Sequence, residues 1–419
     1  MNALSKDTPL FAEIDGRYGV YNLRELFEIH GKGHRIKVPA LLNERGEKTW
    51  VEVEDVVSFG KQPLKRITLA TTRLYAEINE NAIIPAFSNR LFLGTEKQIY
   101  MKFNFVNNLK ITQDPDYNDT LLLATHIPLF LPEGNNEEWE VGFALGFFLA
   151  EGNLDYRKHK NTKHSMEVLN GFARKKEMTL QQYLEHMTEI QHVVLSVGWA
   201  DFERGFIQIL QKHFKLSKPS KKKHTNAYSL CSTDLSFIHL AKDYTDGSDS
   251  HTKHLKNEAF NRTKKFLEGI MNGYLCGDGS YYKKMDLFQV HMTANYKLRD
   301  DLIFIAKALG YDIHLQNDRF EKSPSPSYEK VYHSLLLSIF KNWHRHTVFG
   351  LVKEHIKKIE DVGEREAFNL VLKPIYSEND KRAKFNHLYF TAFGILVSDA
   401  VKTLDRRVLG SSLPVPVSG

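Results

Sequence analysis

At 419 residues the chain is long enough for two or three domains, each with its own hydrophobic core. Its two cysteines, Cys231 and Cys276, are too few for a disulfide framework and fit a reducing compartment. No apolar run reaches membrane-spanning length and no signal peptide is evident, so we expect a soluble protein of the cytoplasm or nucleus. The formal net charge of +6 agrees with a nucleic-acid partner without establishing one.

Residues 3 to about 131 predict short strands separated by frequent turns. Thr49–Val53 and Lys65–Leu69 show part of the apolar–polar alternation of a strand. The sequence Asn-Glu-Arg-Gly at 43–46 predicts the turn of a hairpin, and Leu23–His30 predicts a helix. We therefore expect a mostly β unit, in which spacing alone reveals no catalytic constellation.

A nine-residue apolar stretch, Ala144–Gly152, recurs as Met271–Gly279 about 127 residues later. Both copies lack proline and predict helices, which the preceding residues 139–143 and 265–270 could extend. Each helix carries small residues four positions apart on one face, a spacing that lets two helix backbones approach closely. The residues expected at this interface are Gly146, Ala150, Gly273 and Gly277.

Each copy ends in an acid, Glu151 or Asp278, followed by Gly152 or Gly279. We expect both glycines to be left-handed residues that cap the helices. A carboxylate at a helix C-terminus meets the negative end of the helix dipole, and two close together repel each other unless a hard cation lies between them. The acids therefore predict a divalent-metal site for hydrolysis. The simpler alternative, two buried helices whose acids face solvent, is disfavoured by the duplication.

The same order of elements, helix, strand, strand, helix, strand, strand, is expected after the start of each copy. This internal repeat favours two lobes with pseudo-twofold symmetry. In the first lobe the sequence predicts a helix over 180–190, a strand over 192–197, a helix over 202–214, a basic loop over 218–223 and a strand over 227–232. In the second lobe it predicts strands over 286–292, 311–315 and 332–338 and a helix over 297–309.

Both copies resemble the paired signature of the LAGLIDADG (DOD-type) homing endonucleases. The matching residues are Gly146, Ala150, Glu151 and Gly152 in the first copy and Gly273, Asp278, Gly279 and Ser280 in the second. The departures are Cys276, Gly277 and the glutamate at 151, where aspartate is more usual. The resemblance implies a Mg²⁺-dependent endonuclease that acts as a monomer on a long, specific double-stranded DNA target. Its metal site would comprise Glu151 and Asp278 with Gly152 and Gly279.

Basic residues on one face of a saddle of strands would bind phosphates, and other side chains there would read base edges. The resemblance implies a lysine near each scissile phosphate, where it would help to activate water or steady developing charge. The matching positions are Lys222 or Lys223 in the first lobe and Lys330, with Lys322 second, in the other. Further contacts with DNA are expected from Arg157, Lys158, Lys160, Lys221, Lys222 and Lys322. For the runs 156–160 and 221–223 a solvated surface loop remains the open alternative.

The edges of the β unit resemble the Hint (hedgehog/intein-like) splicing domain of inteins. Residues 3–10, 78–84, 368–372, 387–390 and 393–399 carry this resemblance. Splicing needs a nucleophile at each junction, a base and an asparagine that cyclises. The corresponding residues here are Ala3, Asn81, His387, Ser398, Asp399 and Ala400, with a register at 399–400 that is uncertain by one residue. We expect no splicing, whether through natural loss or deliberate inactivation.

The expected fold class is therefore α+β: a mostly β Hint domain split around an inserted, pseudo-twofold αββαββ endonuclease. The expected parts are 1–131 and 365–399 for the splicing domain, 132–364 for the endonuclease with lobes of about 139–255 and 262–364, and 400–419 as a flanking segment. The expected function is site-specific cleavage of double-stranded DNA by an intein-encoded endonuclease. The alternatives are a DNA-binding protein of this fold that does not cut, and the precursor of a protein-splicing element.

Overall fold

The fold combines helices and strands in two compact units, residues 1–131 with 281–419 and residues 132–280. We call them the β-rich unit and the helix-pair unit. None of the described helices is long and apolar enough to cross a membrane. The computed structural model describes residues 3–43, 46–79, 91–93, 99–101, 120–124, 126–156, 166–175, 177, 179–182, 190–222, 227–247, 250–284, 287–293, 295–321, 332–340, 351–398 and 400.

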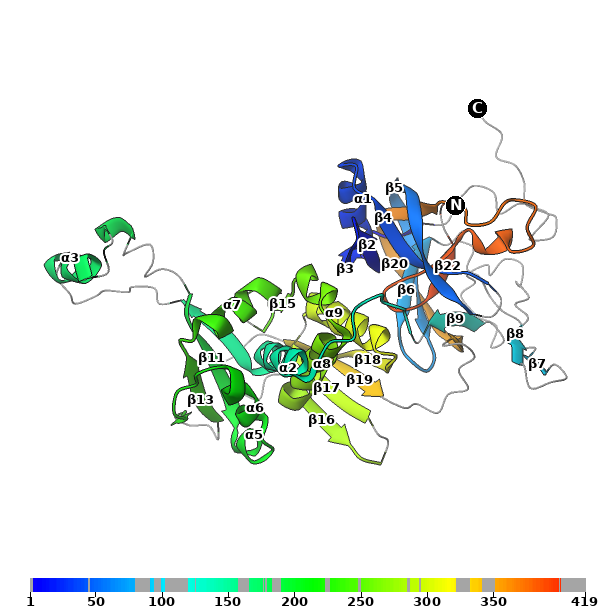
Figure 1. The fold of residues 1–419 in the computed structure, drawn as a ribbon. Coiled ribbons are helices and arrows are strands. Elements are labelled where there is room, and N and C mark those ends of the chain that lie inside the picture. Colours follow the sequence, from blue (N-terminus) through cyan, green and yellow to red (C-terminus); the bar gives the residue numbers. More distant parts are fainter. Residues whose placement is uncertain are drawn as a thin grey trace. The chain divides into compact units, whose positions relative to one another are not determined.

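The β-rich unit contains a ten-stranded sheet (Figure 1). Its main path runs β22-β21-β4-β5-β6-β1-β20-β9, and β2 joins it through β4 and also pairs with β3. The strands are β1 (Leu4–Ser5), β2 (Pro9–Ile14), β3 (Arg17–Asn22), β4 (Ile36–Leu41), β5 (Lys48–Leu69), β6 (Tyr75–Asn79), β9 (Thr120–Ala124), β20 (Leu351–Leu372), β21 (Leu388–Phe390) and β22 (Leu396–Ser398). A separate pair comprises β7 (Leu91–Leu93) and β8 (Ile99–Met101).

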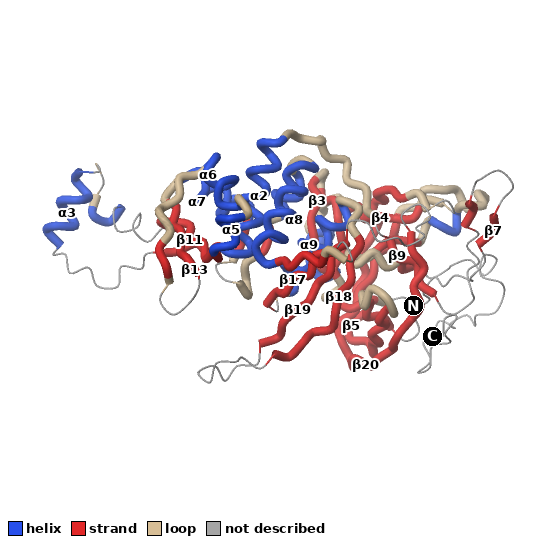
Figure 2. The backbone as a smooth tube through the Cα atoms, turned by 90° about the horizontal axis from the view of Figure 1, so that it is seen from below, coloured by secondary structure: helices blue, strands red, loops and turns tan. Residues whose placement is uncertain are grey.

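The two longest strands, β5 and β20, each have 22 residues and pair antiparallel (Figure 2). The two short strands expected at 49–53 and 65–69 are therefore parts of one strand. The expected hairpin is confirmed, because Leu41 of β4 pairs with Lys48 of β5. The first helix is also confirmed as α1 (Leu23–Gly31), which begins with a capping box between Asn22 and Glu25.

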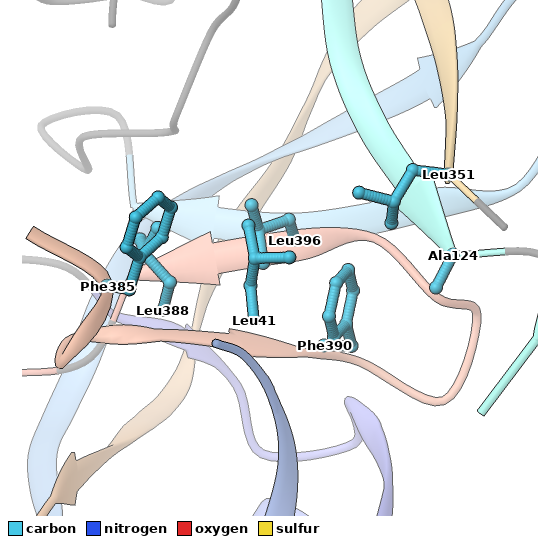
Figure 3. Packing of buried hydrophobic residues seen from close by; sticks show 7 residues of the cluster. All are labelled: Leu41, Ala124, Leu351, Phe385, Leu388, Phe390 and Leu396. Atoms are coloured by element: carbon cyan, nitrogen blue, oxygen red, sulfur yellow. The ribbon is translucent and has the colours of Figure 1, made fainter. Parts of the chain in front are cut away.

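The core of this unit joins strands that lie far apart in the sequence. Figure 3 shows side chains from β4, β9, β20, β21, β22 and the short helix η2 (Ala383–Phe385) packed together. Burial of these apolar side chains away from water ties residues after 350 to residues before 125. The members of the cluster are Leu41, Ala124, Leu351, Phe385, Leu388, Phe390 and Leu396.

Helix α9 (Tyr296–Ala308) also packs within the β-rich unit. The ring of Phe304 lies edge-on to Phe11 with centroids 4.5 Å apart, and the buried Lys307 Nζ donates to the carbonyl of Ala124 at 2.6 Å. Lys297 Nζ donates to the Val20 carbonyl at 2.6 Å. The helix is thus fixed to the first 131 residues by both apolar packing and hydrogen bonds.

The helix-pair unit contains the two predicted signature helices, α2 (Asn136–Glu151) and α8 (Lys264–Asp278), which pack against each other (Figure 1). A four-stranded sheet accompanies them in the order β10-β11-β13-β12. Its strands are β10 (Gly152–Tyr156), β11 (Ile190–Gly198), β12 (Ser220–Lys221) and β13 (Ala227–Ser232). The smaller elements are α3 (Met166–Lys175), α5 (Trp199–Glu203), α6 (Phe206–His213), α7 (Leu235–Tyr244), β14 (Thr245–Asp246), β15 (His254–Leu255) and η1 (Asn257–Asn261).

Two predictions for this unit need correction. The helix expected over 202–214 is two helices, α5 and α6, because the chain breaks at Gly205, whose φ is +80°. The basic loop at 218–223 contains the short strand β12, which pairs with β13. Most of the helix expected over 180–190 lies outside the described residues, and its last residue, Ile190, begins β11.

A second four-stranded sheet repeats the order of the first, with β16-β17-β19-β18 in place of β10-β11-β13-β12. Its strands are β16 (Gly279–Tyr282), β17 (Leu287–Thr293), β18 (Asp312–Glu321) and β19 (Tyr332–Phe340). In both cases a long helix precedes the first strand, and helices separate the second strand from the third. The predicted repeat of elements is thus confirmed.

Candidate functional site

Glycines set the distance between α2 and α8. A Cβ atom added at Gly146 or Gly273 would lie less than 3.0 Å from a carbonyl oxygen of the opposite helix, closer than real Cβ atoms approach. The same holds one turn earlier at Gly142 and Gly269, which the sequence analysis missed. These two glycines continue the four-residue spacing upstream, so a search for that spacing over one more turn would have found them.

The contact continues to the last turn of both helices. A Cβ atom added at Gly277 would lie 3.2 Å from Glu151 Cγ and closer still to Ala150 Cβ. Asp278 follows directly as the last residue of α8, and Glu151 is the last residue of α2. The close packing of the backbones therefore brings the two acids to one end of the helix interface, as the small residues predict.

The expected left-handed caps at Gly152 and Gly279 are wrong. Their φ angles are −104° and −94°, which is extended backbone, because each helix leads directly into a strand rather than into a turn. These positions are crowded instead. A Cβ atom added at Gly152 would lie less than 3.0 Å from the Phe148 ring, and one at Gly279 less than 3.0 Å from the Leu275 carbonyl oxygen.

Both acids are held in surroundings that disfavour their ionised forms. Burial raises the pKa of the Glu151 carboxyl to about 7, with further contributions from the negative charges of Asp278 and Asp201. Burial likewise raises the pKa of Asp278 to about 6, although a hydrogen bond from Tyr274 and the charge of Lys253 act in the opposite direction. Without a counter-ion, two buried and neighbouring carboxyls are partly protonated near neutral pH.

Lys253 is the functional candidate that sequence reasoning missed. The side chain is 3% exposed, and its ammonium group donates to the carbonyls of Phe148, at 2.9 Å, and Gly152. It thus satisfies backbone oxygens at the C-terminus of α2, and its positive charge favours the ionised forms of Glu151 and Asp278. A single lysine in a polar segment carries no recognisable signal, because only the tertiary fold brings it to this helix end.

One of the predicted basic residues also lies near the acids. Lys222 donates a hydrogen bond to the hydroxyl of Ser196 on β11, and its charge lowers the pKa of Glu151. Lys221 lies exposed on β12. The other predicted basic residues, Lys223, Lys330, Lys322, Arg157, Lys158 and Lys160, lie outside the described residues.

The donor set fits a hard divalent cation bound mainly by oxygen. Glu151 and Asp278 supply carboxylates, and a cation would offset the cost of burying their negative charges, which raises both pKa values. Within the described ranges, no group of three or more His, Cys, Asp or Glu residues is placed to hold a metal, so backbone oxygens and water would complete the shell. The carbonyl of Gly152, one predicted ligand, already accepts from Lys253 but keeps a second lone pair.

Two of the predicted splicing positions, Ala3 and Ala400, lie beside β20. Leu4, next to the buried Ala3, pairs with Phe368, and the amide of Ala400 donates to the Leu370 carbonyl at 2.7 Å. His387 precedes β21, and Ser398 ends β22. Asn81 and Asp399 lie outside the described residues. The two junction positions thus contact the same short segment of one strand.

No protein-family model and no curated protein matches the sequence. Among solved structures, the chain is weakly similar to I-DmoI in complex with DNA and Ca, with 12% identity, a TM-score of 0.30 and coverage of 49% of this chain and 85% of that one. For the N-terminal LAGLIDADG domain of DUF199/WhiA the identity is 13%, the TM-score 0.27 and the coverage 51% and 80%. For an intein from a hyperthermophile these values are 15%, 0.22, 30% and 73%. At such low TM-scores, arguments about function rest on the site itself.

Proposed function

We propose that this protein is a divalent-metal-dependent endonuclease that cuts both strands of a specific DNA duplex. One observation carries the proposal. Glycine contacts hold the ends of α2 and α8 close together, so that Glu151 and Asp278 are neighbours. Both carboxyls have raised pKa values there. Two neighbouring acids that repel each other do not stabilise a helix pair. A site for a hard cation, by contrast, needs carboxylate ligands close together.

In this proposal Glu151 and Asp278 bind Mg²⁺ together with backbone oxygens next to them. The bound cation would supply Lewis-acid stabilisation of the charge that develops on the scissile phosphate. Lys222 lies close enough to Glu151 to lower its pKa and would steady the same charge from the side of the sheet. Lys253 would have a structural role rather than contact the DNA, because it fixes the end of α2 through hydrogen bonds to the Phe148 and Gly152 carbonyls.

The sheet of the helix-pair unit offers a surface for duplex DNA. Val193, Leu195 and Val197 of β11 are buried, so the alternate residues of the strand lie on the other face. Across the registers of β10 and β13 this second face carries Asn153, Asp155, His192, Ser196 and Ser229. These polar side chains suit contacts with base edges, and Lys222, which donates a hydrogen bond to Ser196 of that face, suits contacts with phosphates.

We further propose that residues 1–131 and 365–399 form a Hint-type splicing domain that does not splice. The support is the meeting of both junction positions on β20, at Phe368 and Leu370. Ala3 and Ala400 carry no group that could accept an acyl chain, so neither junction can react. The chain would remain intact when flanked by other polypeptides, which mass spectrometry of such a fusion would test.

The nuclease is tested by cleavage of a plasmid library of candidate insertion sites with Mg²⁺. We expect the parent to linearise plasmids at one site, and the variants Glu151→Gln and Asp278→Asn to lose double-strand cleavage while retaining DNA binding. Binding by the parent without any cut, over a range of Mg²⁺ and Mn²⁺ concentrations, would refute the nuclease and favour the non-cleaving DNA-binding protein.

A further inference from the structure

The register of β10 and β11 places a serine beside the end of α2 that carries an acid. Gly152, which directly follows Glu151, pairs with Leu195 in the antiparallel ladder. One step beyond this pair come Glu151 on one chain segment and Ser196 on the other, so these two residues are neighbours. Because Leu195 and Val197 are buried, the side chain of Ser196 between them lies on the second face of the sheet, which we propose to meet DNA.

Ser196 binds the ammonium group of Lys222, which directly follows β12. Lys222 Nζ donates a hydrogen bond to Ser196 Oγ across β13, the strand between β12 and β11. The backbone amide of Lys222 donates to the Ala227 carbonyl at 2.9 Å, and Ala227 pairs with Gly198 of β11. Both of these residues are small and leave space for the lysine side chain to cross β13. Lys222 is thus fixed at its backbone and at its ammonium group.

The charge of Lys222 stays available for a ligand. Its partner is a neutral hydroxyl, and in the described part of the chain Lys222 forms no ion pair with a carboxylate. Two of the three ammonium hydrogens therefore remain for phosphate oxygens. Lys221 lies on the opposite face, because its partner Tyr228 pairs with the buried Val197. Of these two neighbouring lysines, only Lys222 reaches the acid end of α2.

We propose that Ser196 is a positioning residue that holds the Lys222 ammonium beside Glu151, where it contacts a non-bridging oxygen of the scissile phosphate. This inference rests on the nuclease proposed above. The hydrogen bond restricts the long lysine side chain before DNA arrives, so its conformational freedom is not lost in the reaction step. Lys222 then stabilises the negative charge that develops on the phosphate, and Ser196 acts only through Lys222.

Cleavage kinetics with Mg²⁺ provide the first test. Ser196→Ala should lower kcat by about tenfold, the size expected for one hydrogen bond to a charged group. The Kd for DNA, measured with Ca²⁺ in place of Mg²⁺, should change by no more than about twofold, because phosphate contacts over the whole face supply the affinity. Ser196→Thr keeps the hydroxyl and should restore the parental kcat. Ser220→Ala removes a hydroxyl from the exposed strand β12 and is the matched control.

A double-mutant cycle distinguishes positioning from a general effect on the sheet. Lys222→Met should lower kcat by about a hundredfold, as expected when one donor to the developing charge is removed. Ser196→Ala added to Lys222→Met should have no further effect, because Ser196 then has no ammonium group to hold. If Ser196→Ala lowers kcat equally with and without Lys222, the proposed role of Ser196 is overturned.

Amine labelling of the DNA-free protein tests the hydrogen bond without any cleavage. With a succinimidyl ester and mass spectrometry, Lys222 should react more slowly than the exposed Lys221, and Ser196→Ala should accelerate the reaction of Lys222 alone. If the parent shows this pattern and binds DNA without cutting it, the nuclease is wrong and the contact that holds Lys222 stands. If the parent cuts DNA and Ser196→Ala changes neither the labelling nor kcat, the nuclease stands and the role of Ser196 is wrong.

Discussion

At the scale of single residues, Glu151 and Asp278 make the stability of the metal-free protein depend on pH. Their pKa values are raised to about 7 and about 6, so the native state binds protons more tightly than the unfolded chain. The stabilisation is complete below the unfolded pKa near 4 and is lost as the pH rises through 6 and 7. Its size is about 3 kcal/mol for each of the two acids.

We therefore expect the metal-free protein to lose stability between pH 5.5 and pH 8 relative to the double variant Glu151→Gln, Asp278→Asn. Denaturant unfolding at both pH values measures the difference. Addition of Ca²⁺ at pH 8 should restore stability to the parent and not to the double variant, because only the parent offers carboxylates. If stability depends on pH in the same way in the two proteins, the pKa values of Glu151 and Asp278 are not raised in the native state.

A second prediction concerns Lys253. Lys253→Met keeps the length of the side chain but removes the donor to the Phe148 and Gly152 carbonyls, which should cost about 1 to 3 kcal/mol in the free energy of unfolding. The matched control is Lys264→Met on the exposed start of α8, where we expect a change within about 0.5 kcal/mol. Equal effects of the two substitutions, measured by chemical denaturation, would rule out the capping role.

The sequence predicted the acids because their pattern is local and occurs twice. It did not predict Lys253 or Tyr274 as partners of the acids, since these contacts arise only when distant or buried groups come together. Gly152 and Gly279 were predicted to be left-handed caps, and neither their extended backbone nor their crowding was predicted. A left-handed residue reverses the chain, whereas here each helix continues into a strand that needs extended backbone.

At the scale of secondary-structure elements, the glycine contacts predict strong effects of single methyl groups. Gly146→Ala and Gly273→Ala should each cost about 3 kcal/mol, because the new Cβ would collide with a backbone oxygen that cannot move aside. Gly171→Ala on α3 should instead stabilise by about 0.5 to 1 kcal/mol, since its Cβ would point into open space. Unfolding curves of the three variants make the comparison, and a neutral Gly146→Ala would contradict the close contact.

Elements with a strong local pattern were predicted well, as α1, α2, α8, β11 and β13 show. The ribbon of β5 and β20 was not, because its partner strands are separated by about 300 residues and its alternation changes along its length. The break between α5 and α6 was also missed. Gly205 lies inside a helical pattern, and its φ of +80° breaks the helix there.

At the scale of the whole molecule, α9 packs on the first 131 residues within the β-rich unit. We predict that a fragment of residues 132–364 will not fold as a stable monomer, although these are the proposed bounds of the endonuclease. Without the first 131 residues, Phe304 loses Phe11, and the buried ammonium of Lys307 loses the Ala124 carbonyl. The apolar face that is then exposed favours aggregation.

Size-exclusion chromatography and thermal melting of the fragment and the full chain provide the measurement. We expect the fragment to elute as aggregates or to melt without cooperativity, whereas the full chain elutes as a monomer. Phe304→Ala in the full chain also removes the contact with Phe11, and we expect it to lower the free energy of unfolding by about 3 to 5 kcal/mol. A monomeric fragment with a sharp transition would contradict the prediction.

The glycine contacts between α2 and α8 also restrict how this sequence can change over generations. An enlarged residue in a core is often accommodated when a neighbour becomes smaller, but the neighbours of Gly142, Gly146, Gly269 and Gly273 are backbone atoms, which no substitution removes. Side chains on the open face of the sheet carry no such restriction. A programme of directed evolution toward new DNA targets should therefore randomise the sheet and leave the helix pair untouched.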